Sequence, residues 1–388
     1  MATVLLARQL FTPLQAIDDA VLAIEDGIIT AVGARAEVHV PATARVLDFG
    51  DAVLAPGLID MHIHGGAGHD VMEGRDESLA AVERLMTQHG VTSYCPTTVT
   101  APVDATQRSL DALGKAVERA ASGHGDGTRA RPLGVHFEGP FLSHAKRGVH
   151  PPALLQPASR ELFERMWQAA GGRVSVMTIA PEIEGALDVI GEASRRGVCV
   201  SLGHSDAELP QARAAIAAGA RHATHTFNAM RSLDHRNPGL LGAVLTDRAV
   251  TADIIVDGIH VDPVVVDLFL RAKGVEGAVL ITDGISATGM PDGTYMLGGL
   301  EVQVHDGRCE LDGRLAGSVL TLDHAMRNTM QFAKVSLQNA IRMASLNPAN
   351  VLGIANRKGR LCIGADADIA VFTPAGEVVR SIVGGVVN

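Results

Sequence analysis

Hydrophobic and polar positions have one texture at the two ends of the chain and another between them. The N-terminal end consists of short apolar runs, ATVLLA, AVLAIE, IITAVG and ARVLDFG, with the turn Asp26-Gly27 between the second and the third. Near the C-terminal end, DADIAVF and VVRSIVGGVV flank the turn residues Pro374-Ala375-Gly376. Short apolar runs bounded by Gly, Asp and Pro predict β-strands. We therefore expect both ends to form one small, discontinuous β-sandwich domain.

Between these ends, apolar runs alternate with segments such as DESLAAVERLMTQHG and LPQARAAIAAGA, whose composition and spacing favour helices. This alternation predicts βα units. Eight runs qualify as strands: AVLAPGLIDMHIH, VTSYCPTTV, RPLGVHFEGP, RVSVMTIAPE, GVCVSLGHS, RHATHTFN, VTADIIVDGIH and GAVLITDG. Eight such units favour an α/β fold with a (β/α)8 TIM-type barrel over an open doubly wound sheet. The first run is not followed by GxGxxG, which also disfavours a dinucleotide fold.

These patterns predict a division of the chain into a barrel and a β-sandwich domain. We expect residues 54–350 to form the barrel, and residues 1–53 and 351–388 to form the two parts of the β-sandwich. We expect segment 294–314 to form a strand hairpin inserted after the eighth run, with its turn at Asp306-Gly307.

Composition restricts the class of protein. Apolar residues make up 47% of the chain and charged residues 20%, which is typical of a globular enzyme. The net charge is -10 and the basic residues are scattered, so we expect no nucleic-acid partner. The four cysteines are far apart, and the chain has neither a signal-peptide pattern nor a membrane-spanning apolar run. We therefore expect a cytoplasmic protein with reduced thiols and no membrane partner.

Histidine suggests the chemistry, because several of the 16 histidines stand where apolar runs end. The C-terminal strand ends of a barrel meet at one mouth, where active sites lie. Alternate strand residues face one side, so His62 and His64 can bind the same metal. An isolated pair of this kind is better explained by buried histidines with hydrogen-bonded neighbours, but convergence of several ends favours a metal site. Six of the eight ends carry such groups: His62 with His64, Glu138, His204, His225, Asp257 with His260, and Asp283.

Imidazole and carboxylate ligands suit Zn²⁺, which we predict, and they also suit Fe²⁺, Mn²⁺ or Co²⁺. Five candidate ligands exceed the three that one catalytic zinc usually takes from the protein. Two metals bridged by Glu138 would account for the excess. Asp283 follows the apolar Val279, Leu280 and Ile281, so we expect it at the rim, moving a proton between an activated water and a leaving group. The alternative for Asp283 is a cap on a following helix.

Ordered motifs add a family resemblance to this interpretation. They are PGLIDMHIHGG, HFEGPFLS, KRGVHPP, LGHSDA, THTFNAM, VDGIH, LITDG, LAGS, NPANVLGI and KGRLCIGADADIAVF. Together they resemble the N-acetylglucosamine-6-phosphate deacetylases of the amidohydrolase superfamily over nearly the whole chain. The resemblance implies metal-dependent hydrolysis of the acetamide of N-acetyl-D-glucosamine 6-phosphate to D-glucosamine 6-phosphate and acetate, in amino-sugar catabolism and cell-wall sugar recycling.

The resemblance also implies residue roles. Glu138, His204 and His225 would bind the principal metal, and Asp283 would act as general base and then general acid. Members that keep both histidines of the first motif can hold a second metal, so His62 and His64 imply a second site. Substrate contacts are implied for His150 with the backbone of Val149, for Asn228, Ala229, Arg236 and His260, and for the backbone of Leu315, Ala316 and Gly317.

Two of these contacts have ordinary alternatives. Arg236 lies in the polar, turn-rich LDHRNPG and would otherwise be a solvated loop charge. In the family this arginine can reach in from the neighbouring subunit, which implies a homodimer. His260 follows an apolar run and can instead be a satisfied core histidine, although its place at a strand end favours substrate contact.

Three other functions remain open on the sequence. The first is deacetylation of N-acetylgalactosamine 6-phosphate, which differs at one ring hydroxyl. The second is cyclic-amide hydrolysis of the dihydroorotase type, which is disfavoured because no lysine ends a strand where a carboxylated one would be expected. The third is a non-enzymatic barrel that binds a sugar phosphate, holds a structural metal and regulates a partner.

Overall fold

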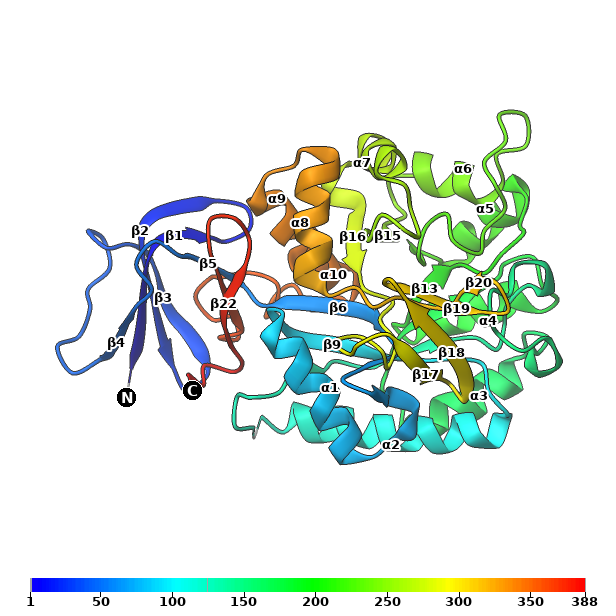
Figure 1. Ribbon diagram of the computed structural model, residues 1–388, viewed down its shortest axis with the longest axis horizontal. Coiled ribbons are helices and arrows are strands. Elements are labelled where there is room, and N and C mark those ends of the chain that lie inside the picture. Colours follow the sequence, from blue (N-terminus) through cyan, green and yellow to red (C-terminus); the bar gives the residue numbers. More distant parts are fainter. Residues whose placement is uncertain (1, 124, 388) are drawn as a thin grey trace.

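The computed structural model describes residues 2–123 and 125–387. It has an α/β fold in two parts (Figure 1). A sheet containing both chain ends lies on one side, and a larger body of parallel strands and surrounding helices lies on the other. The predicted α/β class is confirmed.

Strands from both ends share one seven-stranded sheet, in the order β22-β21-β5-β1-β2-β3, with β4 also pairing with β1. The C-terminal β21 pairs antiparallel with β5, and β5 runs parallel to β1. Leu5, Leu22, Leu54 and Ile369 pack into its core. The strands are β1 (Thr3–Phe11), β2 (Ala16–Glu25), β3 (Ile28–Ala34), β4 (Arg45–Asp48), β5 (Val53–Pro56), β21 (Ile369–Phe372) and β22 (Val378–Ile382).

Every one of the eight predicted runs contains a strand of the larger body. Strands β6, β9, β11, β12, β13 and β14 pair parallel in that order, and β15 pairs parallel with β16. Backbone hydrogen bonds connect the two groups on both sides, from Thr226 N–H to the Asp253 carbonyl and from Asp283 N–H to the His62 carbonyl. The strands are β6 (Leu58–Ile63), β9 (Val91–Thr98), β11 (Val135–Glu138), β12 (Val174–Ile179), β13 (Cys199–Leu202), β14 (His222–Ala223), β15 (Ala252–Ile255) and β16 (Ala278–Ile281).

The first predicted run, AVLAPGLIDMHIH, is two strands and not one. β5 belongs to the sheet of the chain ends and β6 to the parallel sheet, with Gly57 between them. A Cβ at Gly57 would lie 2.1 Å from the Thr92 hydroxyl oxygen, so only glycine permits this close passage. Continuous apolarity conceals the change of sheet, because both strands are fully buried.

Helices cover the parallel strands, and the predicted helices at 76–90 and 209–220 are confirmed as α1 and α5. In α1, Leu79, Val82 and Met86 form a buried stripe. The helices are α1 (Asp76–Gln88), α2 (Val103–Ala121), α3 (Arg160–Ala169), α4 (Ala186–Arg195), α5 (Leu209–Ala218), α6 (Gly239–Thr246), α7 (Pro263–Gly277), α8 (Leu322–Ala333), α9 (Leu337–Ala344) and α10 (Leu346–Val351). Short elements are β7 (Gly65–Gly66), β8 (His69–Asp70), β10 (Arg131–Pro132) and the 3₁₀ turns Val71–Glu73, His144–Lys146 and Pro152–Leu154.

The predicted hairpin at 294–314 is a four-stranded antiparallel meander. Asp306 and Gly307 both have left-handed φ, 48° and 75°, as a two-residue type I′ turn requires. Val302 and Val304 pack against Ile285, which fixes the meander over the ends of the parallel strands. Its strands are β17 (Gly293–Leu297), β18 (Leu300–His305), β19 (Arg308–Leu311) and β20 (Arg314–Leu315).

All four cysteines carry free thiols, as predicted. Within residues 2–123 and 125–387, none of the helices combines the length and the apolarity that crossing a bilayer demands.

Packing of the parallel strands predicts that the same substitution, Ile→Val, changes the free energy of unfolding more at a buried position than at an exposed one. Ile254 on β15 is fully buried, whereas Ile363 is 69% exposed. We expect Ile254→Val to lower the free energy of unfolding by about 1 kcal/mol, because it removes a methylene from a close-packed core. Ile363→Val should change it by less than about 0.5 kcal/mol. Urea unfolding of both variants beside the wild type measures the difference; equal midpoints would contradict it.

Candidate metal centre and active site

Three of the predicted site residues occupy the same position, two residues beyond a parallel strand. His204 follows β13, His225 follows β14 and Asp283 follows β16. Their φ angles are 47°, 30° and 52°, in the left-handed region that non-glycine residues seldom adopt. Such backbone strain persists where surrounding structure enforces it and clusters at functional sites. Here it turns each side chain into the mouth formed by the strand ends.

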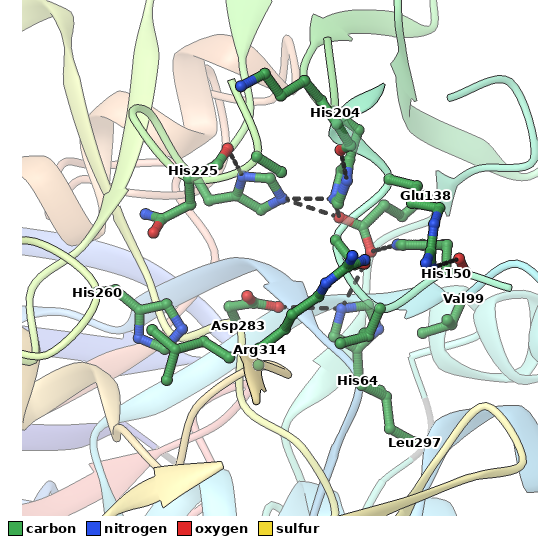
Figure 2. Close-up of a pocket in the computed structure, with 18 of the residues that line it drawn as sticks. His64, Val99, Glu138, His150, His204, His225, His260, Asp283, Leu297 and Arg314 are labelled. Atoms are coloured by element: carbon green, nitrogen blue, oxygen red, sulfur yellow. Dashed lines mark hydrogen bonds and ion pairs between the residues drawn. The ribbon is translucent and has the colours of Figure 1, made fainter. Parts of the chain in front are cut away.

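The first group of side chains surrounds Glu138, the last residue of β11 (Figure 2). Its Oε1 lies 3.1 Å from Nε2 of His204 and 3.1 Å from Nε2 of His225. The two imidazole Nε2 atoms are 3.0 Å apart. All three side chains are buried. The three residues predicted to bind the principal metal are thus within reach of one ion.

The second group lies on the other side of Glu138. Nε2 of His62 and Nε2 of His64 are 3.1 Å apart, and Asp283 Oδ1 is 3.4 Å and 3.1 Å from them respectively. Glu138 approaches both rings, with Oε1 3.5 Å from His62 Nε2 and Oε2 3.4 Å from His64 Nε2. Glu138 therefore stands between two sets of possible ligands.

Hydrogen bonds to backbone carbonyls orient three of these rings. Nδ1–H of His64 donates to the carbonyl of Thr97 (3.1 Å), that of His204 to Lys146 (3.0 Å) and that of His225 to Asn228 (3.2 Å). A proton on Nδ1 leaves the Nε2 lone pair free to bind metal. Unprotonated Nε2 atoms 3.0 Å apart would repel each other unless a cation lay between them. The donor set therefore fits a divalent metal.

Charge at the site favours bound cations. Burial lowers the pKa of His204 to about 4, despite its contact with Glu138. Burial acts in the same direction on His64 and His225, but their bonds to Asp283 and Glu138 respectively raise each pKa to about 9. At His64 and His225 the two carboxylates thus attract positive charge strongly enough to overcome desolvation, whereas at His204 burial prevails.

The carboxylates themselves remain ionised. Burial would raise the pKa of both Glu138 and Asp283. Contacts with imidazoles outweigh burial, holding the pKa of Glu138 well below its usual range and lowering that of Asp283 to about 2. Asp283 is therefore charged at neutral pH and ready to accept a proton.

Asp283 does not cap a helix, so the alternative interpretation of this residue is wrong. The segment after it forms turns, and the next described helix, α8, begins only at Leu322. Its side chain instead faces His64 across the cavity (Figure 2).

A cavity of about 380 Å³ opens over these groups. Its size suits a small polar ligand. Nδ2 of Asn228 is buried and has no hydrogen-bond partner among the described residues, which makes it a donor available to a ligand. Residues with predicted substrate contacts that line the cavity are Val149, His150, Asn228, Ala229, His260, Leu315 and Gly317.

Two predicted contact residues lie outside the cavity lining. Ala316 is buried and donates its N–H to the Cys309 carbonyl, so only its carbonyl is left for a ligand. Arg236 is exposed on the loop before α6, with its N–H bonded to Asp234. Within this chain, Arg236 does not join the site.

His150 lies on a loop, but its side chain is buried next to Glu138. Thr100 N–H lies 3.3 Å from its Nδ1, and its Nε2 lies 3.5 Å from Glu138 Oε2. His150 thus stands beside the carboxylate of Glu138. His260 lies on the opposite side of the cavity, where its Nδ1 is 2.6 Å from Asp257 Oδ2, as an oriented imidazole requires (Figure 2).

The sequence interpretation missed two buried carboxylates that support the site. Asp60 accepts from the Thr282 hydroxyl (2.6 Å) and the His62 N–H (3.3 Å), joining the strands that carry His62 and Asp283. Asp60 precedes His62 by two residues, so strand alternation could have placed it on the same face. Asp253 on β15 accepts from the backbone N–H of His225 and lies 3.0 Å from Nε2 of His222.

Asp253 provides a test of how His225 is positioned. We expect Asp253→Asn to weaken metal binding about tenfold, because the bond to His222 is lost and the strained turn at His225 is held less firmly. Competition with a chromogenic chelator measures the metal dissociation constant. The control is Asp188→Asn, an exposed aspartate paired with Arg160, which should bind metal like the wild type. Unchanged affinity in Asp253→Asn would contradict this role.

Comparison with known proteins gives a consistent result. Residues 53–387 match the amidohydrolase family. The chain is 39% identical over 373 residues to the N-acetylgalactosamine-6-phosphate deacetylase of Escherichia coli O157:H7, covering 96% of this chain and 95% of that protein. It is 35% identical over 373 residues to the N-acetylglucosamine-6-phosphate deacetylase of Bacillus subtilis (strain 168), covering 96% and 93%.

Solved structures extend the similarity to three dimensions. A variant of N-acetyl-D-glucosamine-6-phosphate deacetylase from Mycobacterium smegmatis, in complex with N-acetyl-D-glucosamine 6-phosphate, matches with a TM-score of 0.91 and 34% identity over 100% of both chains. The deacetylase from Pasteurella multocida matches with a TM-score of 0.91 and 28% identity, covering 100% of this chain and 99% of that one. The similarity therefore includes both chain ends.

Proposed function

The chain belongs to the amidohydrolase family, and from this premise we propose that it hydrolyses the acetamide of N-acetyl-D-glucosamine 6-phosphate to D-glucosamine 6-phosphate and acetate. The family resemblance found in the sequence motifs is confirmed. One observation carries the proposal: Glu138 stands between two sets of imidazoles, with Asp283 in contact with one of them. That arrangement supplies cation ligands and a proton-transfer group in one cavity.

Glu138, His204 and His225 would hold the principal metal, and His62 and His64 would hold a second one with Glu138 shared. Bound metal supplies a Lewis acid for the acetyl carbonyl and makes water acidic enough to lose a proton near neutral pH. The residues of the chain perform the remaining tasks.

Asp283 moves the proton that hydrolysis requires. Its Oδ1 accepts a proton from the water that attacks the acetyl carbon, and it then delivers that proton to the amide nitrogen as the C–N bond breaks. The nitrogen leaves as the amine with the delivered proton, and the acetyl group leaves as acetic acid, which ionises to acetate by giving its proton to the amine or to solvent. His260, held by Asp257, would orient or polarise the acetyl carbonyl.

The sugar-phosphate moiety would contact His150 with the backbone of Val149, Asn228 with Ala229, and the backbone of Leu315, Ala316 and Gly317. The unpartnered Nδ2 of Asn228 supports a polar ligand at this place. Arg236 would complete the site from a second subunit, since it lies outside the cavity of its own chain. We therefore propose a homodimer.

Zn²⁺ is the metal we propose, because nitrogen and oxygen ligands at a buried site suit it. Free, widely separated cysteines support a cytoplasmic location. The eight parallel strands, hydrogen-bonded through β14–β15 and β16–β6, support a closed (β/α)8 barrel at 54–350. The sheet shared by both chain ends supports a β-sandwich domain at 1–53 and 351–388.

Acetate release tests the proposed function. Purified protein of measured metal content is assayed with N-acetylglucosamine 6-phosphate, N-acetylgalactosamine 6-phosphate and a dihydropyrimidine. We expect turnover of the first, and loss of turnover after chelation. A higher kcat/KM for the galactosamine epimer would favour the second candidate, which the similarity to the Escherichia coli enzyme supports. Binding of the sugar phosphate by metal-loaded protein without acetate release would favour a non-enzymatic role.

A further inference from the structure

Resting on the proposed function, we infer that Arg314 binds the phosphate group of the substrate from within the same chain. The family resemblance assigns a role to the backbone of Leu315, Ala316 and Gly317, but none to the arginine before them. Arg314 begins β20 of the meander and lines the cavity above the metal-binding groups.

The position of Arg314 at the mouth is fixed by a contact with the opposite wall. Its Nη1 donates to the backbone carbonyl of Gly148 at 3.0 Å. Gly148 belongs to the loop after β11 that also carries His150. Figure 2 shows the side chain extending from the meander towards the side of His150. One guanidinium N–H is thus occupied, and other donors of the planar fork remain for an anion.

The mouth of the cavity is cationic. Arg147 and Arg314 line it, with Lys146, whose Nζ lies 4.0 Å from Asp206 Oδ1. Nη1 of Arg147 donates to the His150 carbonyl at 2.9 Å. Among the residues that the structure describes, no carboxylate lies within ion-pair distance of Arg314 or Arg147. An uncompensated guanidinium at the entrance of a cavity favours a ligand with negative charge.

The substrate can place its negatively charged phosphate at this cationic mouth while its acetamide reaches the floor of the cavity. Its acetamide is on C2 of the sugar ring and its phosphate is on C6, so the two groups leave the ring on different sides. With the acetamide beside Asp283 and Glu138 at the floor, the phosphate extends towards the mouth. Arg314 is the cavity-lining arginine carried by the meander, and it needs no second subunit to reach this position.

Kinetics of two substrates test this inference. Arg314→Gln removes the charge but keeps a donor for the Gly148 carbonyl, whereas Arg314→Lys keeps the charge and loses the fork. We expect Arg314→Gln to raise KM for N-acetylglucosamine 6-phosphate about tenfold with little change in kcat, and Arg314→Lys to raise it less. For unphosphorylated N-acetylglucosamine, kcat/KM should stay at the wild-type value. The control, Arg308→Gln, removes an exposed charge from neighbouring β19 that pairs with Glu310.

Other outcomes would overturn the inference. Equal losses on both sugars would show that Arg314 only fastens the loop at Gly148, and unchanged KM values would show that the phosphate is bound elsewhere. Calorimetry can also compare the binding of glucosamine 6-phosphate with that of glucosamine to the wild type and to Arg314→Gln. This measurement does not depend on turnover. If the wild type released no acetate, the proposed function would be wrong, while a loss of preference for the phosphorylated sugar in Arg314→Gln would still support the phosphate contact.

Discussion

Asp283→Asn is expected to lower kcat about 10²-fold or more while the protein keeps its fold and its metal. The amide is close in size to the carboxylate, so contacts with His62 and His64 can persist. It cannot accept a proton from water at neutral pH, however, and it cannot protonate the leaving nitrogen. Both halves of the proposed proton transfer are therefore lost in one substitution. Steady-state acetate release, with metal content measured on the same preparation, gives the result.

A matched variant separates this loss from a general disturbance of the cavity. Asp292→Asn alters an exposed aspartate that immediately precedes β17 and lies outside the cavity lining. It should retain wild-type kcat. An Asp283→Asn protein with full metal and near wild-type turnover would remove Asp283 from proton transfer and assign the step to another group.

Glu138→Gln is expected to produce the larger loss, about 10³-fold in kcat/KM, accompanied by loss of bound metal. The carboxylate of Glu138 is in reach of both imidazole groups. A neutral amide removes the charge that attracts cations. Its N–H groups would also hydrogen-bond to the imidazole Nε2 atoms, whose lone pairs would otherwise bind metal. Elemental analysis after dialysis, beside acetate release, measures both effects.

The control for Glu138→Gln is Glu301→Gln, an exposed glutamate on β18. It should keep its metal and its rate. Excess divalent metal should restore Glu138→Gln only partly, because the histidines still offer lone pairs but the shared ligand is absent. Full metal content and normal turnover in Glu138→Gln would mean that the ion, or the reaction, lies elsewhere.

Much of the candidate site could be predicted because it depends on strand periodicity. His62 and His64 alternate along one strand, and Glu138 ends another, so their convergence follows from parallel strands meeting at one end. The positions of His204 and His225 followed from the same rule. What the pattern does not contain is the left-handed backbone at both residues, which depends on neighbouring contacts such as that of Asp253.

Contacts between distant segments could not be predicted in the same way. Arg314 belongs to a hairpin whose turns are evident in the sequence, but its approach to Gly148 depends on how the meander packs on Ile285. The division between β5 and β6 was missed because both are apolar, and the change of sheet is evident only from their strand pairing and from the close passage of Gly57 by Thr92. Periodicity describes individual elements, whereas these features arise from the packing of one element on another.

The shared sheet has a consequence for how the chain matures during synthesis. β5 emerges from the ribosome early, but its partner β21 is made more than 300 residues later. Until then, the edge of β5 has unpaired backbone groups that invite pairing with other chains. A nascent or truncated polypeptide that ends before β21 would therefore expose the edge of β5, which pairing with β21 covers in the folded chain.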